Sequence, residues 1–250
     1  GQGLESDGQA AVAISVYQQA VALDPEEDYY YLFLGRALLD YALDLTDAAQ
    51  REDALRQVET VLKRARDLNP LNTDHTANLA RLYRQWASVE TDSALHSQYA
   101  RLSNDFYGQA LTLNPSNYGL WNEWAVLSYT ELEDAAAAQT MLEKSFAIDG
   151  EYDQTYLYQG NLYVWLARRA TVSAEQQTHF ENAIAAYEQG LALAEKGGAD
   201  TLPLRLGLAS AYAGAQQYQA AVDEYLQVLA EANNSYNGWQ VNYILAQLYQ

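Results

Sequence analysis

The sequence predicts an all-α protein built as a solenoid of antiparallel helix hairpins. The first observation is a ladder of three prolines, Pro25, Pro70 and Pro115, which follow one another at intervals of 45 residues. Each proline closes the same phrase, Leu-Asp-Pro or Leu-Asn-Pro. A phrase that returns at a fixed interval of roughly 20–50 residues is typical of a repeat array, in which each unit packs only on its neighbours.

The second observation is a run of apolar and small residues, at helical spacing, ahead of each proline. The three runs are Ala13-Tyr17-Ala20, Val58-Leu62-Ala65 and Ser103-Tyr107-Ala110. The residue before a proline is restricted to extended conformations, so helices tend to end there. Each run therefore predicts a helix that closes at the proline phrase, the first from Ala11 to Leu23.

A partner helix is predicted after each phrase, the first from Asp28 to about Leu43. It carries Tyr31, Leu34, Gly35 and Leu38 on one face, which places a small residue between large ones. The small residue allows a neighbouring helix to approach closely. The pattern returns at Leu79-Ala80-Tyr83, Trp121-Trp124-Ala125-Ser128, Tyr156-Gly160-Tyr163, Leu208-Ala209-Tyr212 and Leu245-Ala246-Tyr249.

These positions resemble the tetratricopeptide repeat, a helix–turn–helix unit of about 34 residues. Its signature is a Trp-like residue, Leu-Gly, Tyr, Ala, an aromatic residue, Ala and Pro, in that order. The resemblance covers residues 11–250 and implies a right-handed superhelical solenoid of about five full repeats with a half repeat at each end. Residues 1–10 are expected to form a flexible N-terminal segment. A HEAT- or armadillo-type repeat also has a period near 45 residues and is the alternative.

The interval between repeats differs from the roughly 34 residues that are typical of the tetratricopeptide family. The large anchors of the second helices are Tyr17, Leu62, Tyr107, Leu142, Tyr187 and Tyr225, at successive intervals of 45, 45, 35, 45 and 38 residues. The three long intervals imply inserts of 11 residues, about three helical turns. We expect each insert to lengthen both helices of a hairpin by about a turn and a half. Capping-box spacing at Asp47…Gln50 and Ser173…Gln176 predicts new helices there.

A further four residues accompany the interval of 38. Two consecutive glycines in Lys196-Gly197-Gly198-Ala199 predict a longer loop between repeats at this point.

The charge balance restricts the partners. The net charge is −19, from 33 acidic and 14 basic residues, and both nucleic acid and anionic lipid would be repelled. The chain has no cysteine, which excludes disulfides and thiolate chemistry. No stretch approaches the ~18 apolar residues that span a bilayer, so we expect no direct membrane insertion by this region.

No constellation for catalysis is evident, and we predict neither an enzyme in this region nor any cofactor. The three histidines, His75, His96 and His179, share no metal-ligand or catalytic spacing, and we interpret them as solvated or half-packed. Hydrolase and phosphate-loop motifs are absent. The carboxylates of Glu26-Glu27-Asp28 stand at a helix start, where negative charge suits the helix dipole.

The tetratricopeptide resemblance implies a concave groove, lined by the first helix of each repeat, that binds peptides or protein segments. Carried over by position, the groove residues are Tyr29, Arg36, Arg81, Arg84, Asn122, Tyr129, Asn161 and Trp165. Arg36 and Arg81 stand one period apart and form the best candidate for an anion anchor, with Arg84 a turn away from Arg81. The alternative is ion pairing with neighbouring carboxylates. Trp86 and Trp165 could be core or exposed.

A narrower resemblance covers one helix hairpin. The run from Leu68 to Leu82 is similar to repeats at the C-terminus of bacterial O-antigen ligase or polymerase-like membrane proteins. It implies an extracytoplasmic domain in surface-polysaccharide assembly, with glycan-assembly proteins as partners and a membrane glycan-transferring part upstream. The alternative is a stand-alone cytoplasmic adaptor that binds peptide segments.

Overall fold

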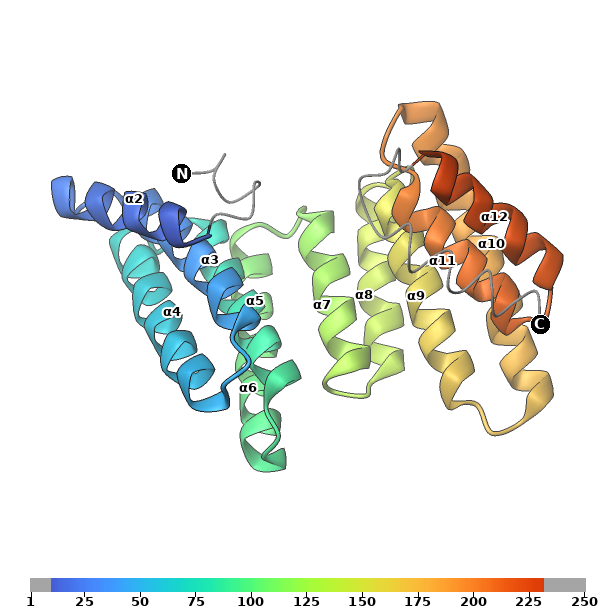
Figure 1. Cartoon of the computed structure of the whole chain (residues 1–250), viewed down its shortest axis with the longest axis horizontal. Coiled ribbons are helices and arrows are strands. Elements are labelled where there is room, and N and C mark those ends of the chain that lie inside the picture. The colour runs from blue at the N-terminus through green and yellow to red at the C-terminus, as the bar shows by residue number, and fades with distance from the viewer. Residues whose placement is uncertain (1–9, 232–250) are drawn as a thin grey trace. The chain divides into compact units, whose positions relative to one another are not determined.

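A computed structural model describes residues 10–231, and within them it contains eleven helices and no strand (Figure 1). They are α2 (Ala10–Leu23), α3 (Asp28–Asp44), α4 (Ala48–Leu68), α5 (Thr73–Val89), α6 (Ser93–Leu113), α7 (Tyr118–Thr130), α8 (Ala135–Ile148), α9 (Asp153–Arg169), α10 (Ser173–Gly197), α11 (Leu202–Gly214) and α12 (Tyr218–Glu231). The all-α prediction is confirmed. Most of the predicted N-terminal segment and the last half repeat, at Leu245–Tyr249, lie outside the described residues.

The chain divides into two compact units, Gly1–Leu120 and Trp121–Gln250. In the first unit, α2 packs on α3, α3 on α4, α4 on α5 and α5 on α6. Helix α3 also contacts α5, so the first helices of successive hairpins lie side by side. This is the contact pattern of stacked hairpins.

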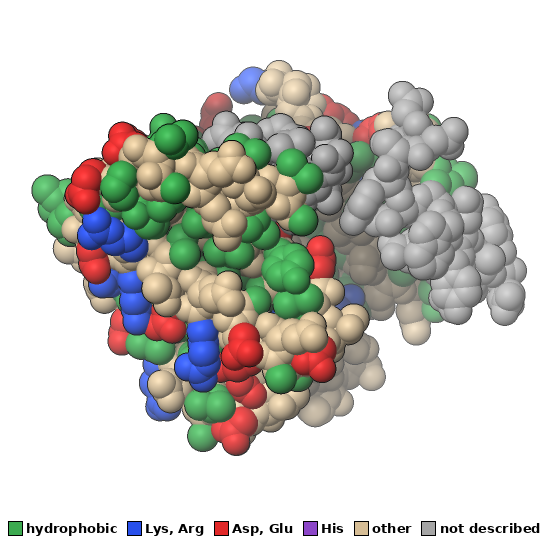
Figure 2. All heavy atoms as spheres, turned by 60° about the vertical axis from the view of Figure 1, so that its left-hand side comes forward, with side chains coloured by type: hydrophobic (Ala, Val, Ile, Leu, Met, Phe, Trp, Pro, Cys, Tyr) green, Lys and Arg blue, Asp and Glu red, His purple; other side chains and the backbone are tan. Residues whose placement is uncertain are grey.

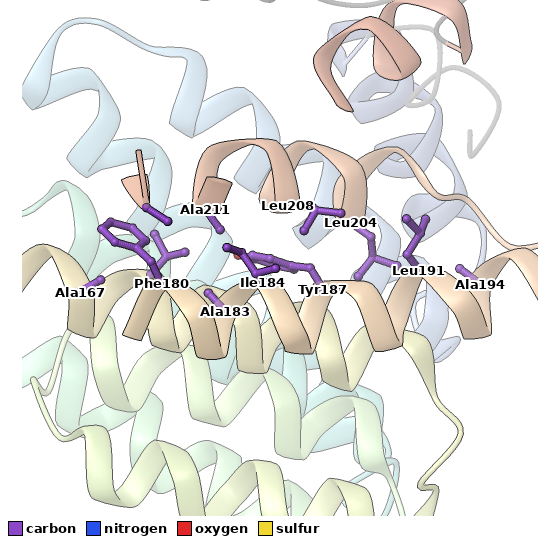
Figure 3. Close-up of a cluster of buried hydrophobic side chains, with 12 residues drawn as sticks. Ala167, Phe180, Ala183, Ile184, Tyr187, Leu191, Ala194, Leu204, Leu208 and Ala211 are labelled. Atoms are coloured by element: carbon purple, nitrogen blue, oxygen red, sulfur yellow. The ribbon is translucent and has the colours of Figure 1, made fainter. Parts of the chain in front are cut away.

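The second unit repeats the scheme. Helix α9 packs on both α8 and α10, α11 packs on both α10 and α12, and α9 also contacts α11. Figure 3 shows Ile184, Tyr187 and Leu191 of α10 pointing toward Leu204 and Leu208 of α11. The core thus runs along the interface between one hairpin and the next.

Helix lengths show where the inserts lie. The hairpin α7–α8 has helices of 13 and 14 residues, whereas α3–α4 and α5–α6 each have helices of 17 and 21. The first helix is therefore four residues longer and the second seven, while the loop between them is one residue shorter, which accounts for the ten residues between the intervals of 45 and 35. Four and seven residues are close to one and two whole turns, so each buried face keeps its phase. The expected equal division was wrong.

The four further residues near Lys196 lengthen a helix and not a loop. Helix α10 has 25 residues and runs to Gly197, and only residues 198–201 separate it from α11. The preceding connections between hairpins, at 24–27, 69–72, 114–117 and 149–152, also have four residues. Gly198 ends the helix in the left-handed conformation, with φ of 69°, where glycine carries no steric penalty.

The two predicted capping boxes differ in outcome. Asp47 is the N-cap of α4 and accepts a 2.8 Å hydrogen bond from the backbone N–H of Gln50, as the spacing predicts. Helix α10 does begin at Ser173, but Val172 holds the cap position and makes no side-chain cap bond. The Gln176 side chain instead donates to the carbonyl oxygen of Ala167 in the preceding helix.

The predicted anchors are all core residues. Tyr17, Leu62, Tyr107, Leu142, Tyr187 and Tyr225 are each at most 6% exposed. The small residue opposite them has the predicted role, since a Cβ on Gly35 would stand 2.3 Å from Leu62 Cδ2. The close approach of the two helices therefore requires glycine at that position.

Candidate functional site

A cavity of about 330 Å³ in the second unit is the candidate binding site. Three helices line it, and each is the first helix of its hairpin, with one residue added from α10. The lining residues are Tyr129 of α7, Asn161, Val164, Trp165, Arg168 and Arg169 of α9, Tyr187 of α10, and Gly207 and Ser210 of α11. The cavity thus follows from the lateral stacking of successive hairpins.

Trp165 is the centre of an aromatic and cationic stack. Its ring meets the Tyr129 ring edge-on, with centroids 5.7 Å apart. The Arg169 guanidinium lies 3.9 Å from the indole centroid, within cation–π range. Arg169 also donates a 3.4 Å hydrogen bond to Glu133. These contacts fix the indole at the cavity wall while it stays half-buried.

Asn161 is oriented by a tyrosine from the next helix. The Tyr187 hydroxyl donates a 2.7 Å hydrogen bond to Asn161 Oδ1. The amide oxygen is thereby engaged, and the Nδ2 group remains as a donor toward the cavity. Burial raises the pKa of Tyr187 above its usual value, so its hydroxyl stays protonated and keeps donating at neutral pH.

Two glycines hold Tyr187 in place. A Cβ on Gly160 would stand 2.4 Å from Tyr187 Cε1, and a Cβ on Gly207 would stand 2.6 Å from the same atom. The ring therefore lies against the backbone of both α9 and α11. This packing carries the hydroxyl to Asn161.

The cavity is positive in an acidic unit. Residues 121–250 contain sixteen acidic and five basic side chains, and two of the five basic ones, Arg168 and Arg169, line this cavity. Arg168 is exposed and forms no hydrogen bond or ion pair with the other described residues. Its guanidinium is therefore available to an acidic ligand.

Three of the sequence-predicted groove residues, Tyr129, Asn161 and Trp165, line this one cavity. Asn122 does not share it. Its side chain is fully buried and donates a 3.0 Å hydrogen bond to the Thr155 hydroxyl, so its prediction as a groove residue was wrong. The position lies at a helix–helix contact, where a small amide fits only when it is hydrogen-bonded.

The four remaining groove residues belong to the first unit. Tyr29 is 41% exposed and its ring lies edge-on to the His75 ring. Arg36 is exposed and lies near enough to Asp40 to act on its charge, which favours the ion-pairing interpretation there. Arg81 and Arg84 are half-buried, and the Arg84 Nε is buried without a hydrogen bond to the described residues. None of these four residues lines the cavity of the second unit.

Sequence reasoning missed six of the cavity residues, which are Val164, Arg168, Arg169, Tyr187, Gly207 and Ser210. Tyr187 was assigned to the core as an anchor, which it also is. A signal was available for Gly207, since a glycine inside a helical pattern often has a packing reason, and here it allows the Tyr187 ring to approach. Arg168 is the penultimate residue of α9 and lies beyond the positions that the repeat pattern marks.

The histidine interpretation was wrong for His75. This side chain is fully buried and its Nε2 lies 2.6 Å from Asp28 Oδ2. Burial by itself would raise the pKa of Asp28, but hydrogen bonds from His75 and Asn69 outweigh it and lower that pKa below the ordinary 3.8. The pair links the start of α3 to the start of α5.

Residues 10–231 lack two features. No group of three or more His, Cys, Asp or Glu side chains there is arranged to hold a metal ion. No helix in the described part of the chain combines the length and the apolar character needed to cross a membrane.

The chain shares its fold with solved tetratricopeptide-repeat structures. A chain of the APC/C hetero-tetramer Cut9-Hcn1 superposes with a TM-score of 0.66 at 16% identity, over 98% of this chain and 41% of that one. Human IFIT1, in a dimer with m7Gppp-AAAA, gives 0.64 at 16% identity, over 88% and 45%. TTC0263, a thermophilic TPR protein from Thermus thermophilus, gives 0.57 at 20% identity, over 86% and 98%.

The fold is therefore a solenoid of the tetratricopeptide type, as the sequence predicted. The HEAT- and armadillo-type alternative is set aside. This chain spans less than half the length of the first two structures it matches. No protein-family model and no curated protein sequence matches the chain.

Proposed function

We propose that this region is a non-catalytic scaffold that binds a segment of a partner protein in the cavity of its second unit. The observation that carries the proposal is that Trp165, Asn161 and Arg168 line one cavity of about 330 Å³. An indole wall, a fixed amide donor and an unpaired guanidinium together suit an extended segment with an apolar side chain beside an acidic one.

The charge distribution supports a protein ligand over a nucleic acid. Human IFIT1 is solved with m7Gppp-AAAA on the same fold, but this chain has a net charge of −19. A polyanion would meet long-range repulsion from the rest of the surface. A short acidic segment needs only the local positive charge of Arg168 and Arg169.

The test is site-specific photo-crosslinking in the native host. A photoreactive amino acid at position 168 should trap a partner, while the same probe at Lys144, exposed on α8, should not. The trapped segment is then synthesised, and its affinity is measured by fluorescence anisotropy against the wild-type region, Arg168→Glu and Lys144→Glu.

Arg168→Glu should lower the affinity for the segment by at least about tenfold, because it replaces an attraction by a repulsion. Lys144→Glu makes the same charge change and should leave the affinity within about twofold, since it lies outside the cavity. Tyr187→Phe should weaken binding less, by loosening Asn161. Equal affinities for both charge reversals would refute this site.

A narrower proposal places this region outside the cytoplasm, as part of an O-antigen ligase or polymerase-like protein that recruits glycan-assembly proteins. Its support is the similarity of residues 68–82 to the repeats of such proteins. Reading the gene upstream of the codon for Gly1 tests it. A series of membrane-spanning segments in the same frame would support the proposal, and a start codon at that point would leave the stand-alone adaptor.

A further inference from the structure

A second cavity, of about 300 Å³, lies in the first unit between two neighbouring hairpin tips. The first turns of α4 line one side, and the last turn of α5 and the start of α6 line the other. Its lining residues are Ala48, Arg51, Glu52, Leu55, Trp86, Val89, Glu90, Thr91 and Leu95. The lining thus combines the second helix of one hairpin, α4, with both helices of the next hairpin, α5 and α6.

The inserts create this cavity. Helices α3, α4, α5 and α6 carry the extra turns, and this is the one pair of consecutive long hairpins among residues 10–231. Their added turns face each other beyond the standard repeat core. A hairpin with helices of 13 and 14 residues, such as α7–α8, lacks these added turns.

The floor is apolar and rigid. Leu55 is 1% exposed and Trp86 is 2% exposed. The Trp86 ring stacks on Tyr99 with centroids 4.5 Å apart, and its Nε1 donates a 2.8 Å hydrogen bond to Glu52 Oε2. Leu95 is 40% exposed and stands at the mouth, so an apolar wall continues from the floor to solvent.

The rim offers an unengaged carboxylate oxygen. Glu90 Oε1 accepts from the backbone N–H groups of Thr91 at 2.7 Å and Asp92 at 2.8 Å, which fixes the carboxylate. Its Oε2 bonds to none of the described residues. Arg51, the one cation in the lining, donates to the Leu45 carbonyl oxygen at 3.0 Å.

The surroundings are negative. Residues 44–56 and 90–92 carry six acidic side chains and two basic ones. Figure 2 presents a face of the molecule on which Lys and Arg side chains alternate with Asp and Glu. Burial raises the pKa of Tyr99 behind the floor, and the charges of Glu52 and Glu90 raise it further against the opposing effect of Arg56.

We propose that this tip cavity binds a long basic side chain, arginine or lysine, of a partner protein. The aliphatic stem lies along Leu95 and Val89 above the buried floor, and the cationic head reaches Glu90 Oε2. The Trp86 ring already has the Arg56 guanidinium 5.9 Å from its centroid. Such side chains bury an apolar stem and keep a charged tip, which matches an apolar floor with an acidic rim. A carboxylate stabilises such a head through a charge-assisted hydrogen bond.

The test is NMR titration of the ¹⁵N-labelled region with N-acetyl-arginine methylamide. Its control is the citrulline analogue, which has the same shape without the charge. The indole N–H resonance of Trp86, identified by triple-resonance assignment, reports on the cavity. We expect a saturable shift of this resonance with the arginine compound and a much smaller one with citrulline.

Three variants complete the test. Glu90→Gln removes the charge but keeps Oε1 as an acceptor for the backbone N–H groups of Thr91 and Asp92. It should lower the affinity for the arginine compound by about five- to tenfold. Leu95→Lys should abolish the shift, because its own ammonium fills the mouth. Glu143→Gln, an equal charge change exposed on α8, should have no effect.

Equal shifts with both compounds, or an unchanged affinity in Glu90→Gln, would overturn the proposal. Arg168→Glu should leave this titration unaltered, which keeps its outcome separate from that of the cavity in the second unit.

Discussion

The Tyr187 ring packs so closely on Gly160 that a Cβ at Gly160 would stand 2.4 Å from its Cε1 atom. Gly207 closes the other approach to the ring, so Tyr187 cannot move aside. The same ring is a core anchor and the support of Asn161. One packing contact thus couples the stability of the second unit to the geometry of its candidate site.

Gly160→Ala should therefore destabilise the protein, although alanine is the better helix former. Overpacking of this kind costs roughly 1–3 kcal/mol, which exceeds the helix-propensity gain of about 1 kcal/mol. Urea unfolding followed by circular dichroism measures the change. Gly197→Ala is the matched control, because nothing lies within 4 Å of its added Cβ. The prediction fails if both variants are equally stable.

Arg205 should be the most important charged residue for stability in the second unit. Its side chain is 13% exposed and binds Glu195 at 2.6 Å, Glu224 at 3.1 Å and Glu231 at 2.8 Å. Removing Arg205 leaves three partly exposed carboxylates, at 53%, 21% and 34% side-chain exposure, close together without a counter-charge. Solvent screens them in part, so the expected cost is about 2 kcal/mol.

Arg205→Met tests this by urea unfolding, with Arg64→Met as control. Arg64 forms a single exposed pair with Glu26, at 45% and 76% side-chain exposure, and such pairs contribute less than about 1 kcal/mol. A loss in Arg205→Met no larger than in Arg64→Met would show that solvent screens the cluster.

The Asp28–His75 pair should make stability fall in acid. The folded-state pKa of Asp28 is lowered below 3.8, so its contribution is complete above that value and is lost as pH falls through the folded-state pKa. Asp28→Asn should flatten the pH dependence of the urea midpoint below about pH 4. The exposed Asp24→Asn is the comparison, since its carboxylate accepts only a long, 3.4 Å hydrogen bond from the Glu26 backbone N–H, and it should leave the dependence unchanged.

Tyr212 should make the stability of the protein fall at alkaline pH. Burial, with a 2.7 Å hydrogen bond to Glu188, raises the pKa of Tyr212 from 10.0 to about 12. A raised folded-state pKa gives stability that is complete below the unfolded value of 10 and is lost as pH rises through 12. Tyr212→Phe should therefore reduce the loss of stability between these values, as followed by thermal unfolding. An unaltered slope would contradict the assigned hydrogen bond.

Much of the fold could be predicted because the repeat supplies the same local evidence several times. Proline phrases mark helix ends, and a small residue recurs beside a large anchor. Chain connectivity in a solenoid is local, so neighbouring units are also neighbours in space. The start of α4 at Asp47 shows how far a local hydrogen bond can be predicted from spacing.

The division of the insert could not be predicted in this way. Eleven residues restore the helical phase of the hairpin however they are divided, so spacing alone does not choose between equal and unequal helices. Packing chose near-whole turns for each helix, because each must keep its own buried face. Lys196 and Gly197 similarly extend α10 and do not join a loop, since glycine tolerates the end of a helix as well as a turn.

The sequence by itself determined the all-α class, the order of hairpins, the anchors and the candidate groove residues Tyr129, Asn161 and Trp165. Only the tertiary structure decided that Asn122 is buried while Arg168 is exposed, and that Trp86 is buried while Trp165 is half-buried. Helical periodicity gives the face on which a residue lies. Whether that face meets a neighbour or solvent depends on how far the next hairpin extends.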